Sequence, residues 1–143
     1  MKRISLGVLA YLVPTFMLGF VWHLVLFKHL YDELAMYRSD VIIPFGFLSM
    51  MIQAALFAFV YERSFARLSF GTGRRVLSYS AFGAALSWSF TTIAVAAKNV
   101  MTSVPDYILV ETGFTVLQWS IVGPLTVLAF HAARAERPEF APR

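Results

Sequence analysis

Two side chains suited to acid–base chemistry, His23 and Glu111, lie inside long apolar stretches of this sequence. Each is expected about one helical turn from the same end of its stretch. Ionisable groups inside membrane helices are costly, so both residues raise the hypothesis of a functional site. A histidine that faces a glutamate could relay protons or act in acid–base catalysis. The alternative is that both side chains reach head groups or water, Glu111 being an ordinary first-turn acid.

The same pair could hold a metal ion, but the spacing of the histidines does not favour this. His29 follows His23 by six residues, so the two do not share a helix face well. The chain contains no cysteine, which excludes thiolate ligands and thiolate nucleophiles. We therefore expect no metal and no cofactor. The sequence offers no catalytic set, and enzyme activity stays open.

A second group of candidate residues is expected near the middle of the helices. Gln53 and Gln118 each lie roughly a dozen residues from the same end of their stretches. Tryptophan usually prefers the membrane interface, so Trp88 and Trp119 at a similar depth are unusual. These residues could line a small amphipathic pocket. The alternative is that a buried glutamine hydrogen-bonds to a serine or threonine of the third apolar stretch, 76–97. The candidate binding residues are thus His23, Gln53, Trp88, Glu111, Gln118 and Trp119.

Four arginines between the second and third apolar stretches form a third candidate. Arg63, Arg67, Arg74 and Arg75 could together bind an anionic lipid head group. The alternative is a solvated helix end, in which these charges and Glu62 face water.

The elements that must position these residues are four apolar stretches. Three contain no Asp, Glu, Lys or Arg, and the fourth contains only Glu111. Each is long enough to cross a hydrocarbon core roughly 30 Å thick as a helix. The whole chain of 143 residues is 59% hydrophobic and 14% charged, which leaves no room for a separate soluble core. We predict an all-α, four-transmembrane-helix bundle in one domain, 1–143, with helices near 4–27, 41–61, 76–97 and 107–130, and a cytoplasmic tail at 131–143.

The basic residues predict the orientation of this bundle. Nine of the 12 fall before the first stretch, between the second and third, or after the fourth, and three, Lys28, Arg38 and Lys98, fall on the other side. Basic residues in short loops stay cytoplasmic, so both termini and the middle connection are predicted there. The net charge of +4 is then a topology signal, and nucleic-acid binding is not expected. The localisation expected from these patterns is a membrane, with the chain as a multi-pass protein; the resemblance described below implies that this is the bacterial inner membrane.

Shorter patterns refine this prediction. Gly83, Ser87 and Thr91 are spaced four apart, which lets helix backbones approach closely within the protomer or across a homo-oligomer interface. Lys28 and Asp32 have the spacing of a helical ion pair, in an outer connection expected to be partly helical. Asp40 is placed to cap the second helix. Ser103 begins a similar pattern before the fourth helix.

The first helix carries a family resemblance. Gly19-Phe20-Val21-Trp22 runs into Leu26-Phe27-Lys28 and then Tyr31. With the chain length and helix number, this resembles the small bacterial four-helix membrane proteins grouped as domains of unknown function. The resemblance covers nearly the whole chain and implies a polytopic inner-membrane protein with no established activity. Small multidrug-resistance exporters are similar in size, but they use a glutamate deep in the first helix, where this chain has none.

Three functions stay open at this point. The first is a non-enzymatic membrane subunit, as a homo-oligomer or beside a partner membrane protein. It is favoured by the small-residue face around Gly83 and by the small interior of one protomer. The second is a transporter of a small amphipathic or cationic solute, with a mid-membrane pocket and Glu111. The third is an intramembrane enzyme with His23 and Glu111 as acid–base groups, which requires the two side chains within about 3 Å.

Overall fold

The computed structural model describes residues 2–38 and 40–135, and every regular element in these ranges is a helix, as predicted. The first part of the chain forms α1 (Lys2–Val21), the π-helix η1 (Trp22–Leu26) and the short α2 (Lys28–Glu33). The second forms α3 (Ile43–Arg63) and the 3-10 helix η2 (Phe65–Arg67). The third forms α4 (Thr72–Ser87), the π-helix η3 (Trp88–Ile93) and α5 (Ala94–Ala96), and the last is α6 (Val104–Ala135).

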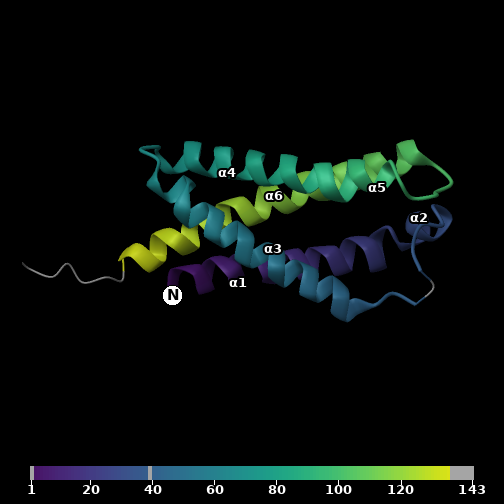
Figure 1. The fold of residues 1–143 in the computed structure, drawn as a ribbon, viewed down its shortest axis with the longest axis horizontal. Helices are drawn as coiled ribbons and strands as arrows, with labels where there is room; N and C mark the ends of the chain where they lie inside the picture. Colours follow the sequence, from purple (N-terminus) through teal and green to yellow (C-terminus); the bar gives the residue numbers. More distant parts are fainter. Residues whose placement is uncertain (1, 39, 136–143) are drawn as a thin grey trace, which may run out of the picture.

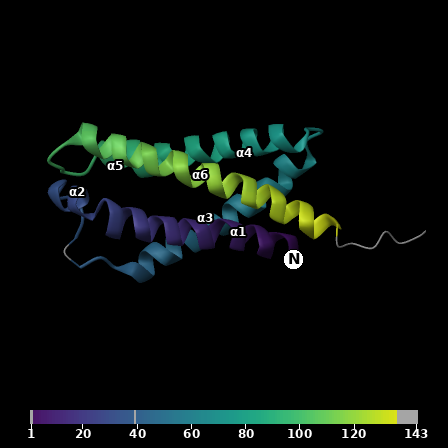
Figure 2. The ribbon, with the colours of Figure 1, turned by 180° about the vertical axis from the view of Figure 1, so that it is seen from behind.

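The long helices form two layers (Figure 1). In this view α3 and α4 lie in front of α1 and α6, and the reverse view shows α1 and α6 in front (Figure 2). Helix α1 packs against α3 and α6, and α6 packs also against α4. Helices α3 and α4 meet near their connection and diverge toward the other end. The bundle is therefore closed on three sides and open on the fourth over part of its length.

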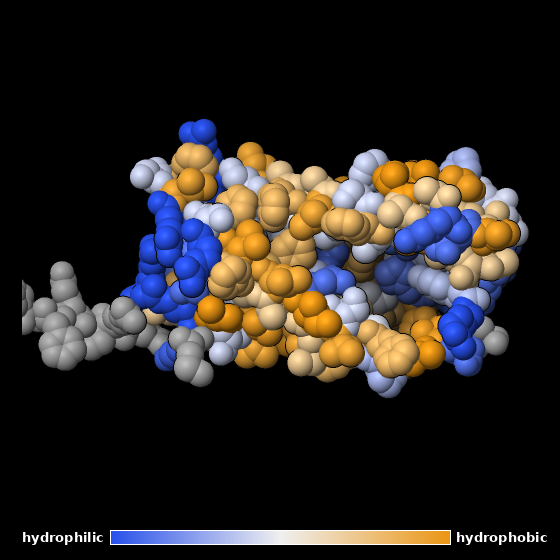
Figure 3. All heavy atoms as spheres, viewed as in Figure 1, coloured by the Kyte–Doolittle hydropathy of each residue, from blue (hydrophilic) through white to orange (hydrophobic). Residues whose placement is uncertain are grey.

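Both ends of the described chain lie at the end of the bundle that carries the α3–α4 connection (Figure 1). We call this the basic end, because it carries Arg3, Arg63, Arg67, Arg74, Arg75 and Arg134. The opposite end carries the connections at 27–42 and 97–103. Hydrophilic residues gather at the basic end and apolar residues cover much of the middle of the visible face (Figure 3).

A cluster of aromatic side chains holds the four helices together. Tyr11 of α1 stacks on Phe57 of α3, with ring centroids 5.3 Å apart. Trp119 of α6 contacts Phe57 edge-on at 4.8 Å and Tyr79 of α4 at 5.6 Å. Such pairs add about 0.5–1.5 kcal/mol each beyond their buried area. Tyr61 completes the cluster at the basic end, where its ring lies 5.0 Å from that of Tyr79.

The small-residue face of α4 is used inside the protomer. A Cβ atom on Gly83 would lie only 2.1 Å from the Trp119 ring, so the glycine lets that ring lie against the α4 backbone. One turn further on, Ser87 Oγ accepts a hydrogen bond of 3.1 Å from Trp119 Nε1. The prediction that this face contacts another helix is confirmed, and the neighbour is α6 of the same chain.

Three helical segments are long and apolar enough to cross a membrane: Lys2–Leu26, Ile43–Arg67 and Val104–Arg134. The predicted segment 76–97 is also helical, but it is divided among α4, η3 and α5 and does not reach the same apolarity. Serine, threonine and small residues lower its hydropathy, although it contains no charged residue between Val76 and Ala97. The protein is therefore all-helical with three helices suited to membrane association.

The helix boundaries differ from the sequence prediction in several places, and α4 begins at Thr72 rather than near 76. Asp40 does not cap α3, which begins at Ile43 after Ile42 and has Pro44 in its first turn. The Asp40 carboxylate accepts hydrogen bonds from Arg38 instead, at 3.2 and 3.3 Å. Helix α6 starts at Val104, before the predicted 107, and continues to Ala135, so residues 131–135 are helical rather than tail. The rest of the predicted tail, 136–143, lies outside the described residues.

Two local predictions are confirmed. Ser103 Oγ accepts a hydrogen bond of 3.4 Å from the Asp106 amide, which caps α6. Lys28 donates to Asp32 within α2, as the four-residue spacing predicts.

Hydrogen bonds between the two connections fix α2 at the opposite end. Thr102 donates from its amide to Leu34 O at 3.2 Å and from its hydroxyl to Glu33 O at 2.8 Å. Ala35, with a φ of 54°, adopts the left-handed conformation just after α2. These contacts hold Tyr31 of α2, which is 1% exposed, against Tyr107 and Val110 of α6.

Candidate functional site

The open side of the bundle forms a cavity of about 630 Å³ between α1, α3, η3 and α6, which we call the side cavity. It corresponds to the hollow between the α3 side and the α4–α5 side in Figure 3. Most of its walls are apolar, and Phe16, Phe47 and Phe90 contribute from three different segments. Glu111 is the one carboxylate among its described lining residues, which include no lysine or arginine. The cavity is thus an apolar groove with one acidic group.

His23 and Glu111 meet at the wall of this cavity. His23 Nε2 lies 3.2 Å from Glu111 Oε1, and the Tyr31 hydroxyl donates to the same oxygen at 2.6 Å. Glu111 is 5% exposed, which makes it a nearly buried acid. The π-helical turn η1 carries His23, and α2 supplies Tyr31, so the bend at the end of α1 brings both onto α6.

The hydrogen bonds of His23 determine how many protons this pair holds. His23 Nδ1 lies 2.8 Å from Gly19 O, and a carbonyl oxygen only accepts, so Nδ1 carries a proton. The contact between Nε2 and Glu111 Oε1 then needs a further proton, which resides on either residue. In both cases the pair is electrically neutral. Loss of that proton leaves one negative charge in the cavity.

Aromatic rings surround the pair. The His23 ring lies 4.9 Å from Tyr31 and 4.7 Å from Phe114, and Tyr37 stacks on Tyr31 at 5.0 Å. Burial raises the pKa of Tyr31 and of Tyr37 well above their usual values, and the neighbouring Glu111 carboxylate raises both further. Both tyrosines therefore stay protonated, and Tyr31 remains a hydrogen-bond donor to Glu111 at any physiological pH.

The two glutamines predicted at mid-depth are joined through one tyrosine. The Tyr11 hydroxyl donates to Gln53 Oε1 at 2.8 Å, and Gln118 Nε2 donates to Tyr11 at 3.4 Å and to Thr15 Oγ1 at 3.2 Å. Gln53 Nε2 in turn donates to Ser49 Oγ at 3.1 Å. Both glutamines line the side cavity. These partners belong to α1 and α3, and among the described residues neither glutamine bonds to a serine or threonine of the stretch 76–97, so the packing alternative is wrong in its partner helix. That the glutamines bind a ligand stays a prediction.

The two predicted tryptophans do not line the side cavity. Trp119 is 1% exposed and belongs to the aromatic core. Trp88 is 36% exposed and donates from Nε1 to Thr112 Oγ1 at 2.9 Å, outside the side cavity. Position along the chain predicts the depth of each tryptophan but not the direction in which its side chain points from the helix.

Three tyrosines of the site were missed by sequence reasoning. Tyr31, Tyr37 and Tyr107 lie around Glu111, the last two as lining residues of the cavity. Tyr31 and Tyr37 stand in a polar connection, where tyrosine is ordinary at a membrane interface. The signal that could have found Tyr31 is its helical spacing with Leu34, which marks a buried face of α2.

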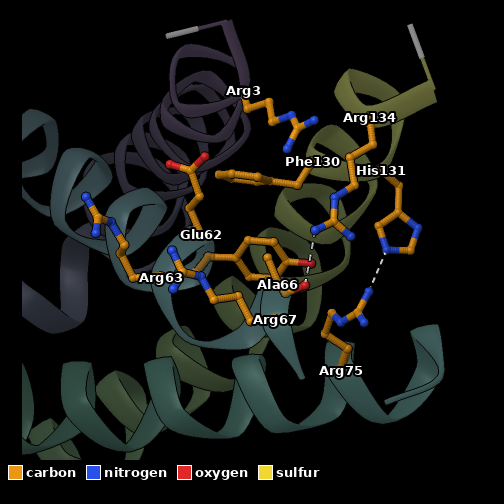
Figure 4. Close-up of a pocket in the computed structure, with 10 residues that line it drawn as sticks. Arg3, Glu62, Arg63, Ala66, Arg67, Arg75, Phe130, His131 and Arg134 are labelled. Atoms are coloured by element: carbon orange, nitrogen blue, oxygen red, sulfur yellow. Dashed lines mark hydrogen bonds between the residues drawn. The ribbon is translucent and has the colours of Figure 1, made fainter. Parts of the chain in front are cut away.

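The structure brings three of the four arginines predicted to bind a lipid head group together at the basic end. Arg63, Arg67 and Arg75 line a second cavity of about 390 Å³, which we call the basic cavity. Arg74 does not, since its guanidinium lies over the Phe70 ring at 4.2 Å. Arg3 and Arg134, from the ends of α1 and α6, join the others around this space (Figure 4). Within the described residues no cluster of three or more metal-binding side chains occurs.

No protein-family model, no curated protein and no solved structure matches this chain.

Proposed function

We propose that the chain is a four-span protein of the bacterial inner membrane with both termini in the cytoplasm, in which the segment from α4 to α5 is the fourth span. The distribution of basic residues supports this orientation. Helices α4, η3 and α5 follow one another from Thr72 to Ala96 without a break. They pack beside α6, so the serines and threonines of this segment can contact a neighbouring helix instead of lipid.

The function we propose is the binding and transport of a small amphipathic cation in the side cavity. The observation that carries this proposal is a nearly buried acid, Glu111, in a cavity with otherwise apolar or uncharged walls. A cationic head group would lie beside Glu111, and the rings of Tyr37, Tyr107 and Phe114, which line the same cavity, would offer it cation–π attraction. An apolar tail would lie along the phenylalanines of α1 and α3.

The proton of the His23–Glu111 pair couples this binding to pH. With the proton bound, the pair is neutral and offers a cation no net charge. When the proton leaves, one negative charge remains, and a cation restores neutrality in a site where unpaired charge is costly. One proton and one cation therefore compete for the same place, which is the basis of proton-coupled exchange.

The test measures cation binding and proton release together. Full-length protein in lipid nanodiscs is titrated with octyltrimethylammonium, whose fixed charge cannot release a proton of its own. Calorimetry in two buffers of different ionisation enthalpy should report about one proton released per cation bound. Glu111→Gln should weaken binding about a hundredfold, the range for removing one partner of a buried ion pair.

Asp106→Asn is the matched control, because Asp106 is an exposed acid near the start of the same helix. It should bind the cation as the wild type does. Binding without proton release, or equal binding by Glu111→Gln, would remove this pair from the mechanism. In proteoliposomes, proton-coupled flux of the cation should depend on Glu111 in the same way.

The enzyme hypothesis is supported by the same contact, since His23 Nε2 and Glu111 Oε1 lie 3.2 Å apart, near the distance that acid–base partners require. A carrier releases its ligand unchanged, whereas an enzyme does not, and mass spectrometry of the recovered ligand separates the two. The subunit hypothesis has lost one of its two supports, because Gly83 and Ser87 contact α6 within the protomer.

A further inference from the structure

Within residues 2–38 and 40–135, the basic cavity carries positive charge that nearby carboxylates do not balance. Its described lining includes five arginines, Arg3, Arg63, Arg67, Arg75 and Arg134, and one carboxylate, Glu62. Figure 4 shows Arg3 and Arg134 entering from one side and Arg75 from the α4 side. Positive charges gathered around one cavity repel one another, and a bound anion relieves the repulsion.

Arg75 is the most informative of these residues, because its charge is almost fully buried at 9% exposure. Its Nη2 donates to Leu68 O at 2.8 Å and to Phe70 O at 3.1 Å, and its Nη1 donates to His131 Nε2 at 2.9 Å. All three acceptors are neutral, since a histidine that accepts at Nε2 is unprotonated there. Among the described residues Arg75 has no carboxylate partner. A buried guanidinium without a counter-charge is costly.

Two polar atoms at the same place make no hydrogen bond to a described residue. Arg75 Nε and the Tyr61 hydroxyl are both buried and unbonded, and both residues line the basic cavity. The two side chains lie close enough to interact, but a guanidinium only donates, so it cannot accept the proton of the tyrosine hydroxyl. Buried polar groups are nearly always hydrogen-bonded in folded proteins, so this pair indicates an absent acceptor. The oxygen atoms of an anion would accept from both.

We propose that the basic cavity binds a phosphate-bearing anion, with the phosphate oxygens accepting from Arg75, Tyr61, Arg67 and Arg134. Guanidinium groups match phosphate oxygens in paired hydrogen bonds, and several arginines around one site favour a dianionic phosphomonoester over a singly charged diester. The source is either the head group of a membrane lipid or a soluble phosphate compound. Both present the same group to the same side chains.

The test uses the full-length protein in phosphatidylcholine nanodiscs and two probes. Inorganic pyrophosphate, added from solution and followed by calorimetry, represents the soluble source. Phosphatidic acid, mixed into the nanodiscs and followed by native mass spectrometry, represents the lipid source, with phosphatidylglycerol as its diester counterpart. Binding of either probe supports the site, and the probe that binds identifies the source. Phosphatidic acid is expected to bind in preference to phosphatidylglycerol.

Three variants and one control test which residues bind the phosphate. Arg67→Gln and Arg134→Gln should each weaken binding about tenfold. Tyr61→Phe should weaken it about threefold without lowering the melting temperature of the unliganded protein, because it removes a hydroxyl that is unbonded there. Arg74→Gln is the matched control, since Arg74 neighbours Arg75 but lies over Phe70 outside the cavity. It should bind as the wild type does.

Three results would overturn the proposal. The first is that neither probe binds. The second is that Arg74→Gln weakens binding as much as Arg67→Gln and Arg134→Gln do, which would indicate general attraction to a basic surface. The third is that binding occurs only after Glu136→Gln and Glu139→Gln are introduced together, which would show that carboxylates of the chain itself occupy the cavity.

Discussion

The two cavities of this protein hold buried charge of opposite sign and differ in how that charge can be neutralised. Glu111 lies beside His23 and Tyr31, so its charge can be cancelled by a proton that the site itself holds. Arg75 lies among neutral acceptors, and a guanidinium does not release its proton in a protein. Under the two proposals above, a proton can neutralise the side cavity, whereas the described residues leave the basic cavity to be neutralised by an added anion.

The largest expected effect is that each variant loses ligand binding at its own cavity and keeps it at the other. Glu111→Gln should reduce octyltrimethylammonium binding about a hundredfold and leave pyrophosphate or phosphatidic acid binding unchanged. A double variant, Arg67→Gln with Arg134→Gln, should reduce phosphate binding about a hundredfold and leave cation binding unchanged, because distant sites contribute independently. Calorimetry on all three proteins checks this. Loss of both ligands in one variant would mean that the cavities are coupled or that the fold is damaged.

The next effect is a difference in pH dependence. Where the His23–Glu111 pair still holds its proton, cation affinity should rise by up to about tenfold for each unit of increasing pH, since one proton is displaced. Phosphate affinity should be nearly flat above about pH 7, where a phosphomonoester is already a dianion and arginine stays charged. Titrations of both ligands across pH 6 to 9 measure the two slopes. Equal slopes would contradict the distinction between the cavities.

The smallest effect concerns the hydroxyl of Tyr31. Tyr31→Phe removes the 2.6 Å hydrogen bond to Glu111 and should weaken cation binding about fivefold. Because burial raises the pKa of Tyr31, the loss should be the same throughout the titration, with no inflection from tyrosine ionisation. Tyr37→Phe is the control, as it keeps the ring stacked on Tyr31 and leaves the bond to Glu111 in place. If Tyr37→Phe weakened cation binding more than Tyr31→Phe does, the hydroxyl of Tyr31 would not be the donor on which binding depends.

The sequence was sufficient to predict those features that depend on residues close together in the chain. Apolar length predicts the long helices, and the spacing of Gly83 and Ser87 predicts their close contact with another helix. The start of α3 was predicted wrongly, because Asp40 has two possible uses and nothing local decides between capping a helix and pairing with Arg38. Pro44 then sets where the helix begins.

The candidate sites depend on the direction in which each side chain points from its helix as well as on its depth. That direction depends on how distant segments pack, so neighbouring residues do not predict it. His23 and Glu111 are 88 residues apart, and they meet because the π-helical turn η1 changes the register at the end of α1. Side-chain direction also separates the two tryptophans, which are predicted at a similar depth. Trp88 is partly exposed at the surface, whereas Trp119 is buried in the core. Arg3 joins the basic cavity only because the start of α1 lies beside the end of α6.

The close approach of α4 and α6 also predicts how this sequence can drift over evolutionary time. A Cβ on Gly83 would meet the ring of Trp119 at 2.1 Å, and a Cβ on Gly123 would meet Ser80 Oγ at 1.8 Å. Replacement at either glycine therefore demands a compensating, smaller side chain at its partner or a wider helix separation. Distant homologues should consequently reveal themselves through paired substitutions at 83 with 119 and at 80 with 123, even where overall identity has faded.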